Sequence, residues 1–292
     1  MMGFGEAIAY GAATIVNAIA IGKGAAFGLN LKTKAKVTLT DEAGIVKGKI
    51  VSEPKENTKL IEEAVKVVFE YFGLKEKLGA IVETESNIPI AQGLKSSSVA
   101  ANALILGTLA ALNKKLDDKT ILSLSVKAAF KAKTTITGAY DDTCASYYGN
   151  IIITDNIKQK ILKKAKIKKN YRILIHLPPE KVYTVQSDVK KMKLLAPQIQ
   201  LAFNEALKGN YWKALTLNGI LYSAALGYSQ KPIIDALEAG ALAAGLSGKG
   251  PAVVAVVEEE KVDKVLDVWK TYKGKLIETT INRKKASILK SE

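Results

Sequence analysis

The order of apolar and polar residues divides the chain into segments of strand and helix character. Residues 6–41 are rich in Ala, Ile, Val, Thr and Gly, and residues 36–40 and 44–51 alternate between polar and apolar side chains. Alternation of this kind places one set of side chains in a core and the other in water, as in a β-strand. We therefore expect several short strands at the beginning of the chain.

Helical spacing follows these strands. Apolar residues recur every three or four positions over 58–72, and this segment stops at Gly73. The pattern then predicts a strand over 79–85, helices over about 96–112 and 118–132, and a strand over 150–154. The first half thus consists of strands, a helix, a strand, a loop, two helices and a closing strand.

The second half is introduced by a lysine-rich run at 158–169, which we expect to form an exposed hairpin or linker. Helical periodicity extends over 188–226, with a break at Pro197 and a turn at residues 209–210. The other predicted elements are strands over 171–177, 253–257 and 275–280 and helices over 232–239 and 259–270. This half therefore has the character of an α/β sandwich with β-α-β connections.

Composition indicates an ordered globular protein. The 292 residues are 48% hydrophobic, which leaves room for two domains. No apolar run approaches the roughly 20 residues needed to span a bilayer, and the N-terminus lacks the basic region of a secretory signal. We expect a cytoplasmic protein without a membrane partner. The single Cys144 excludes an internal disulfide, and the single His176 argues against zinc sites and a serine–histidine triad; we expect both residues in the core.

The net charge of +15 has two interpretations. A basic chain can bind nucleic acid, but here nearly all of the positive charge is lysine, with arginine only at Arg172 and Arg283. Nucleic-acid surfaces usually combine arginine with interleaved aromatic residues. We favour a solvated lysine surface and no nucleic-acid partner, and retain an RNA-binding module as the alternative. The same charge would attract an acidic small molecule.

The candidate anion site is the loop Pro89–Ser98, between the strand at 79–85 and the apolar helix that follows. Unpaired N–H groups at a helix N-terminus attract anions. Gly93 permits close approach of the backbone, Lys95 adds a charge, and three serine hydroxyls can bind phosphate or a metal. Serines before a helix also act as N-caps, so the loop alone leaves both roles open.

Two other glycine-containing segments carry charged side chains. The segment 138–142 ends in Asp141 and Asp142 and is predicted as a turn between a helix and a strand. Adjacent carboxylates can hold a metal or act as a base, although a surface turn is the commoner reason for such a sequence. The loop 245–251 contains Lys249 as its only charge and is equally compatible with a plain tight turn.

Three motifs in fixed order, Pro-x-x-x-Gly-Leu-x-Ser-Ser, Gly-x-x-Asp-Asp and Ser-Gly-x-Gly-Pro, together resemble the superfamily of galactose, homoserine, mevalonate and phosphomevalonate (GHMP) kinases. The resemblance covers essentially the whole chain. Segments 24–28 and 138–142 look most like the archaeal shikimate kinases. Standard P-loop and dinucleotide fingerprints are absent.

The resemblance implies an α+β fold of two domains. These are an ATP-binding domain at 1–157, similar to ribosomal protein S5 domain 2, and a ferredoxin-like α/β sandwich at 158–292. It implies ATP-dependent phosphorylation of the 3-hydroxyl of shikimate in aromatic amino-acid biosynthesis, with Mg²⁺ as cofactor. Homoserine and mevalonate kinases are the alternatives within the superfamily, and either a monomer or a homodimer is compatible with it.

The resemblance also implies roles for individual residues. ATP phosphates should be bound by Pro89, Gly93, Leu94, Lys95, Ser96, Ser97 and Ser98, with Ser97 on the magnesium ion, and by Gly248, Lys249 and Gly250 of the third motif. Asp142, seven positions before Gly149, matches the catalytic base, and Asp141 is the second catalytic candidate.

The chain departs from the family at three of these places. Lys95 stands where glycine is common, Lys249 where serine is usual, and Lys131 where many members place a magnesium-binding glutamate. The carboxylate of shikimate calls for a cationic partner, for which the candidates are Lys23, Lys32, Arg172, Lys249 and Arg283.

Overall fold

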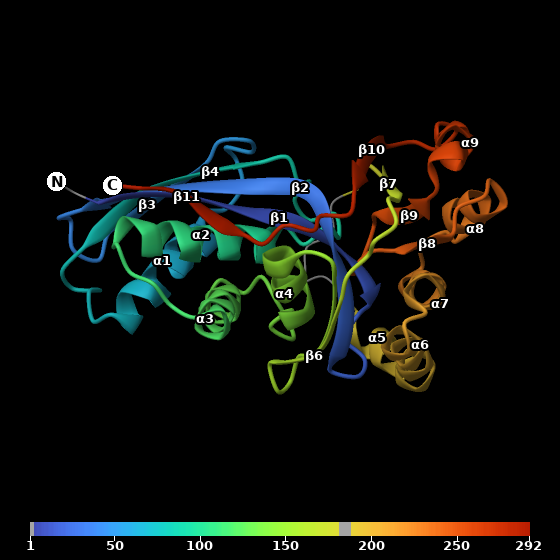
Figure 1. Ribbon diagram of the computed structural model, residues 1–292, viewed down its shortest axis with the longest axis horizontal. Coiled ribbons are helices and arrows are strands. Elements are labelled where there is room, and N and C mark those ends of the chain that lie inside the picture. Colours follow the sequence, from blue (N-terminus) through green and yellow to red (C-terminus); the bar gives the residue numbers. More distant parts are fainter. Residues whose placement is uncertain (1–2, 181–187) are drawn as a thin grey trace.

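Two β-sheets and the helices packed on them form the molecule (Figure 1). The structure is a computed structural model that describes residues 3–180 and 188–292. The larger sheet has seven strands, five of them in the order β11-β1-β2-β4-β3, with β5 and β6 attached beside β2. The smaller sheet has four strands in the order β10-β7-β9-β8. This mixed architecture confirms the predicted α+β class.

Two long strands replace the several short ones expected near the N-terminus. Strand β1 (Phe4–Val16) pairs antiparallel with β2 (Lys23–Thr40), and the register shifts at Tyr10/Gly11 and again between Thr14 and Val16. Each irregularity bends the pair without ending it. Alternation of buried and less buried positions is sustained only over residues 29–40 of β2, whereas residues 11–16 of β1 and 24–29 of β2 are all buried, so the pattern along the sequence divides each long strand into parts.

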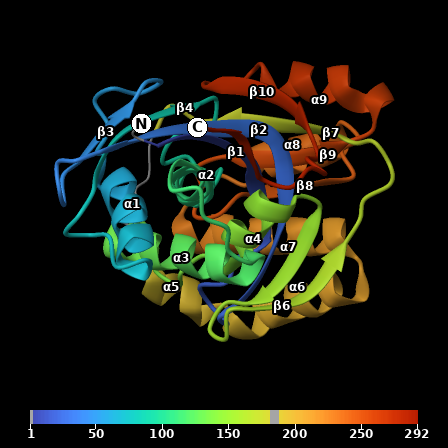
Figure 2. The same ribbon diagram turned by 60° about the vertical axis from the view of Figure 1, so that its left-hand side comes forward.

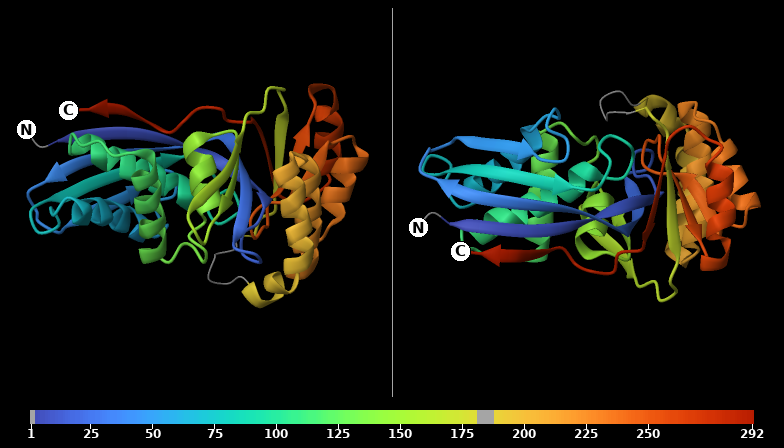
Figure 3. Two further views of the ribbon diagram at one scale, coloured as in Figure 1. Left: turned by 60° about the horizontal axis from the view of Figure 1, so that its bottom comes forward. Right: turned by 90° about the horizontal axis from the view of Figure 1, so that it is seen from above.

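The other strands of the large sheet come from both halves of the chain. β4 (Gly79–Ser86) pairs with β2, and β3 (Val46–Ile50) lies parallel to β4. β5 (Ile151–Asp155) pairs with the first residues of β2 and forms a hairpin with β6 (Lys160–Ala165). The lysine-rich run, expected as a hairpin or a linker, thus supplies the second strand of a hairpin whose first strand is the buried β5. β11 (Ser287–Ser291) pairs with β1, which brings the two ends of the chain together (Figure 3).

Four helices cover one face of this sheet (Figures 1 and 2). They are α1 (Lys59–Tyr71), α2 (Ser96–Ala111), α3 (Asp118–Lys131) and α4 (Tyr140–Tyr148). The opposite face is open to water: Leu29 and Leu31 of β2 are buried, whereas the intervening Asn30 and the following Lys32 are exposed. In the described part of the chain, no helix is long and apolar enough to cross a membrane.

The smaller sheet contains β7 (Arg172–Leu177), β8 (Ala243–Leu246), β9 (Val253–Val257) and β10 (Lys275–Thr280), all antiparallel to their neighbours. The helices between these strands are α5 (Val189–Leu194), α6 (Ala196–Lys208), α7 (Tyr211–Leu226), α8 (Lys231–Glu238) and α9 (Val262–Trp269), the last preceded by a short 3₁₀ turn (Glu259–Lys261). If α5–α8 are counted as one helical layer, this half of the chain has the order β7, helices, β8, β9, α9, β10. This is the β-α-β-β-α-β order of a ferredoxin-like fold.

The two halves share one continuous apolar core. α8 and α9 bury Ile233 and Val265 with Leu174 on one face of the smaller sheet, forming a separate cluster. Ile175 and Val254, on the other face, belong to the same cluster as the core of the large sheet. The division into two domains at residues 157/158 stays a proposal. Two strands that follow this boundary in the sequence, β6 and β11, belong to the larger sheet of the first half.

The two singular residues of the sequence lie inside the protein, as expected. Cys144 on α4 is fully buried, and His176 on β7 is 3% exposed. The Nε2 atom of His176 lies 3.0 Å from the carbonyl oxygen of Lys273, and its ring packs beside those of Trp269 and Tyr272. Burial lowers the pKa of His176, so its neutral form is favoured in this core.

Gly5 on β1 and Gly107 on α2 provide a test of how closely this helix packs on the large sheet. A methyl group on Gly5 would lie 2.3 Å from the Gly107 carbonyl oxygen, a backbone atom that cannot move aside, whereas a methyl on Gly107 would meet the Val37 side chain at 3.2 Å, which a shift of a few tenths of an ångström relieves. We expect Gly5→Ala to lower the free energy of unfolding by about 1–3 kcal/mol. Gly107→Ala should be nearly neutral, because better helix propensity offsets the tighter packing. Urea denaturation of both variants measures the difference; equal effects would contradict it.

Candidate active site

A polar cleft lies where four loops meet between the two halves. Its walls are the turn after β1 (17–19), the loop before α2 with the first residues of that helix (91, 93 and 95–98), the loop before α4 with the first turn of that helix (134–137, 139, 141 and 142) and the loop after β8 (248–250). The three predicted motifs are thus brought together, and the turn after β1 joins them. Two predicted residues stand apart: Leu94 is buried in the core, and Pro89 does not line the cleft.

The loop before α2 lines the cleft and has an unusual backbone. Ala91, Gly93 and Lys95 all have left-handed φ values, of 58°, 85° and 65°. The helix begins at Ser96 with Lys95 as its N-cap, and no side chain caps it. The N-cap role considered for the serines is therefore not realised, and the first N–H groups of α2 are available to an anion.

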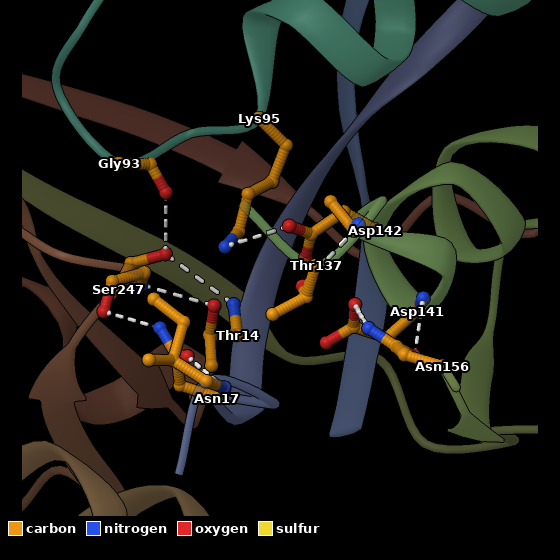
Figure 4. A network of polar contacts seen from close by, with 12 residues as sticks. Thr14, Asn17, Gly93, Lys95, Thr137, Asp141, Asp142, Asn156 and Ser247 are labelled. Carbon is orange, nitrogen blue, oxygen red and sulfur yellow. Dashed lines mark hydrogen bonds and ion pairs between the residues drawn. The ribbon is translucent and has the colours of Figure 1, made fainter. Parts of the chain in front are cut away.

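The loop after β8 is attached to the loop before α2 by a hydrogen bond (Figure 4). The Ser247 hydroxyl donates to the Gly93 carbonyl oxygen at 2.8 Å. Gly93 must be glycine here, because a Cβ atom would lie 2.3 Å from the Ser247 carbonyl oxygen. The first and third motifs of the sequence thus meet through a side chain of one and the backbone of the other.

Two polar residues of the β1 end hold the same loop from the other side (Figure 4). The Gly248 N–H donates to the Thr14 hydroxyl at 2.9 Å, and the Asn17 side chain donates to the Gly248 carbonyl oxygen at 2.9 Å. Our sequence interpretation missed both. The sequence offered only a weak signal, because Thr14 and Asn17 are polar residues on either side of the apolar pair Ile15-Val16; their burial is seen in the structure alone.

A nearly buried ion pair connects the starts of α2 and α4. Lys95 Nζ lies 3.1 Å from Asp142 Oδ2, and the two side chains are only 10% and 11% exposed. The other carboxylate oxygen of Asp142, Oδ1, is buried and has no hydrogen-bond partner among the described residues. One oxygen of the carboxylate is therefore held by a lysine while the other can accept a proton from a bound molecule.

The Asp141–Asp142 pair does not form the surface turn that we considered the commoner reason for this sequence. Both residues lie in the first turn of α4 and are buried, at 3% and 8% exposure. Acidic residues are favoured there because the positive end of the helix dipole stabilises them. The structural context therefore supports a chemical role for the pair.

Asp141 is fixed in place by Asn156, a residue that the sequence did not indicate. The backbone N–H of Asp141 donates to Asn156 Oδ1 at 3.2 Å, and Asn156 Nδ2 donates to Asp141 Oδ1 at 2.8 Å. Burial, reinforced by the charge of Asp142 and opposed by Lys95, raises the pKa of Asp141 to about 7. Gly24 makes room for this carboxylate, since a Cβ atom there would lie 2.2 Å from Oδ2.

Of the five cationic candidates for the acceptor carboxylate, only Lys249 lines the cleft. Arg172 pairs with Glu259 and Glu278, and Arg283 donates to the Lys169 carbonyl oxygen and to Asn170. Lys32 is exposed on the open face of the large sheet, and Lys23 does not reach the cleft wall.

Lys131, which occupies the expected position of a magnesium-binding glutamate, also lies outside the cleft. Its Nζ atom is 2.7 Å from Glu70 Oε1, on the surface between α3 and α1. The metal role therefore cannot be transferred to this position, and the acidic groups of the cleft are Asp141 and Asp142 alone among its lining residues.

Comparison with protein families gives two matches along the chain. Residues 59–150 match the profile of the GHMP kinases N terminal domain, and residues 200–275 match that of the GHMP kinases C terminal domain. A shikimate kinase of Methanosarcina acetivorans is 45% identical over 284 residues, covering 97% of this chain and 95% of that protein. A shikimate kinase of Pyrococcus abyssi is 42% identical over 279 residues, covering 95% and 99%.

Solved structures show the same fold at low sequence identity. The mevalonate kinase of Methanococcus jannaschii superposes with a TM-score of 0.78 at 18% identity, covering 95% of this chain and 98% of that one. A homoserine kinase of Cytophaga hutchinsonii gives 0.74 at 16% identity, covering 98% and 97%. These likenesses establish the architecture of the whole chain.

The raised pKa of Asp141 predicts a pH-dependent stability. Between pH 4 and 7 the carboxyl group ionises on unfolding but stays protonated when folded, so its contribution to stability declines as pH rises toward 7. We expect Asp141→Asn to gain stability relative to the native protein over this range, by up to about 4 kcal/mol, and to keep a constant advantage above it.

Chemical denaturation at pH 4.5, 6 and 8 measures this gain. The exposed Asp263→Asn on α9 removes the same charge from the surface and is the matched control. A stability difference between Asp141→Asn and the native protein that does not change with pH would contradict the assignment.

Proposed function

The chain belongs to the GHMP kinase family, and on this premise we propose that it is an ATP-dependent shikimate kinase, which phosphorylates the 3-hydroxyl group of shikimate. Relatives named shikimate kinase, 40–45% identical over nearly the whole chain, support the choice of acceptor. The observation that carries the reaction type is the cleft itself. The uncapped N-terminus of α2 faces Asp142, which has one carboxylate oxygen held by Lys95 and the other unpartnered within the described structure.

A second pocket beside the cleft fits the nucleoside of ATP. It is mainly apolar, with Ile50, Leu60 and Ile61 among its lining residues. It shares the wall formed by Ala91, Ser96, Ser97 and Thr134 with the cleft. We place the adenine ring in this pocket and the phosphates across the shared wall, so that the γ-phosphate enters the cleft at the start of α2.

Phosphoryl transfer requires neutralisation of oxygen charge and an oriented nucleophile. The N–H groups of α2 and the Lys95 ammonium supply positive charge beside the phosphates. The acceptor hydroxyl oxygen forms a bond to the γ-phosphorus while the bond to the β-phosphate oxygen breaks and ADP departs. Asp142 Oδ1 takes the hydroxyl proton, because Oδ2 is held by Lys95.

The residues present fit a magnesium ion that arrives with the nucleotide. No group of three or more acidic, histidine or cysteine side chains suited to a metal occurs in the described structure. Mg²⁺, however, commonly uses few protein ligands and completes its shell with phosphates and water. Ser97, on the wall between pocket and cleft, would hold it there. When bound, the ion would neutralise charge on the phosphate oxygens.

The acceptor can be tested directly with a panel of shikimate, homoserine, mevalonate and galactose. We expect ADP release with magnesium-ATP to depend on shikimate and to exceed that with each other acceptor by at least about 100-fold in kcat/KM, since missing buried contacts are costly. Product analysis should show the phosphate on the 3-hydroxyl. Preferential use of homoserine or mevalonate would identify the corresponding kinase and contradict the choice of shikimate.

Substitution of each aspartate separates their roles. Asp142→Asn keeps the size of the side chain but removes the proton acceptor, so we expect kcat to fall by about 100- to 10,000-fold with a small change in KM for shikimate. Asp141→Asn should mainly raise KM for shikimate, with a smaller loss of kcat. Steady-state kinetics, with circular dichroism to verify folding, measure both. Near-native kcat in Asp142→Asn would rule out its role as the base.

A further inference from the structure

Asn156 lies behind Asp141 and is held in one orientation. It follows β5, is 4% exposed and is not among the described residues that line the cleft. Its Oδ1 atom accepts from the Thr154 hydroxyl at 2.6 Å and from the backbone N–H of Asp141 at 3.2 Å. Because a backbone N–H can only donate, the atom of Asn156 that faces it must be the oxygen. The amide nitrogen therefore points at the Asp141 carboxylate.

This orientation gives the two oxygens of the Asp141 carboxylate different surroundings. Oδ1 accepts from Asn156 Nδ2 at 2.8 Å, and Figure 4 shows the second oxygen turned away from Asn156. That second oxygen, Oδ2, lies over the backbone of Gly24, where a Cβ atom would approach it to 2.2 Å. Since Asp141 lines the cleft and its Oδ1 is engaged by Asn156, Oδ2 is the oxygen left for a bound molecule.

Asn156 also affects the charge of this carboxylate. No ion pair of the described residues includes Asp141, because Lys95 pairs with Asp142 instead. Burial and the charge of Asp142 raise the pKa of Asp141 to about 7, whereas Lys95 and the donating amide of Asn156 favour its ionised form. Removal of this amide would therefore raise the pKa of Asp141 further. The ionisable groups around Asp141 are Asp142 and Cys144 of α4, Lys95 before α2 and Lys249 after β8.

We propose that Asn156, fixed by Thr154, is a positioning residue for the reaction: it binds one oxygen of Asp141 and so presents the other as a hydrogen-bond acceptor to a hydroxyl group of the bound substrate. This inference rests on the proposed function, in which that substrate is shikimate. The ribose of ATP also carries hydroxyl groups, and separate KM values for the two substrates distinguish these sources.

The test measures KM for shikimate and for magnesium-ATP with the full-length chain between pH 5.5 and 9. For Asn156→Ala at pH 8 we expect KM for shikimate to rise about 5- to 50-fold, near the scale of a lost hydrogen bond to a charged group, and KM for ATP to stay within about twofold. In the native protein KM for shikimate should rise as pH falls through about 7, because protonation removes the acceptor oxygen. In Asn156→Ala this rise should begin at a higher pH, because the ionised form has lost a donor.

Two further substitutions isolate the donating amide and its support. Asn156→Asp keeps an oxygen for the Asp141 N–H and the Thr154 hydroxyl but replaces the amide nitrogen by oxygen. It should move the pH profile upward by at least about one pH unit, because two carboxyl groups then face each other. Thr154→Ser keeps the hydroxyl donor and should remain near native, whereas Thr154→Ala should shift the profile in the same direction as Asn156→Ala, by a smaller amount.

Two controls identify effects from other sources. Asp141→Asn has no ionisable group at this position, so its pH profile gives the contribution of the remaining groups. Asn204→Ala, at an exposed asparagine on α6, controls for the loss of an asparagine side chain. Thermal unfolding verifies the fold of each variant, and Asn156→Asp with the two Thr154 variants carries the comparison if Asn156→Ala does not fold.

The outcomes separate positioning from a purely structural role. A rise in KM for ATP alone, with the shifted pH profile, would keep the positioning role and assign the hydroxyl group to the nucleotide. An unchanged KM for both substrates, or an equal rise in both with the native pH profile, would overturn the inference while native activity remains intact. Failure of the native protein to phosphorylate shikimate would instead overturn the proposed function and, with it, this inference.

Discussion

The ion pair between Lys95 and Asp142 is the interaction on which the site depends. Two helices, α2 and α4, direct their N-termini at one cleft, and each start carries a charged side chain. A single buried charge would be costly there, whereas a pair at 3.1 Å compensates much of that cost. The same contact fixes the orientation of the Asp142 carboxylate and keeps a cation beside the proposed phosphate position, so binding and proton transfer share one geometric constraint.

This arrangement requires the second half of the chain as well as the first. Ser247, after β8, bonds to the Gly93 carbonyl oxygen, and Gly248 bonds to Thr14 and Asn17 at the end of β1. These contacts join segments more than 150 residues apart in the sequence. Since the apolar core is continuous across both halves, the loop after β8 is held against the loop before α2 by the whole fold.

Glycine permits the close approaches that such a site requires. Gly24 leaves space for the buried Asp141 carboxylate, and Gly93 leaves space for the Ser247 carbonyl oxygen. A methyl group at either place would meet a fixed polar atom at 2.2–2.3 Å. The small residues of the early strands are therefore part of the site, in addition to their role in strand packing.

The sequence by itself determined most of the helices and strands and the three motifs, because periodicity and turn chemistry are local properties. The α+β class was implied by the resemblance to the GHMP kinases, and the short strands β8 and β11 were not predicted. The sequence did not determine the length of β1 and β2, since the paired ends of these strands are buried at every position and do not alternate. Nor did it predict that Asp141 and Asp142 begin a buried helix, or that Thr14, Asn17 and Asn156 support the site. Only the tertiary structure distinguished Lys249 from Lys23, Lys32, Arg172 and Arg283. Charge type can be read from a sequence, but burial and the distance between groups far apart in the chain depend on how the whole chain packs.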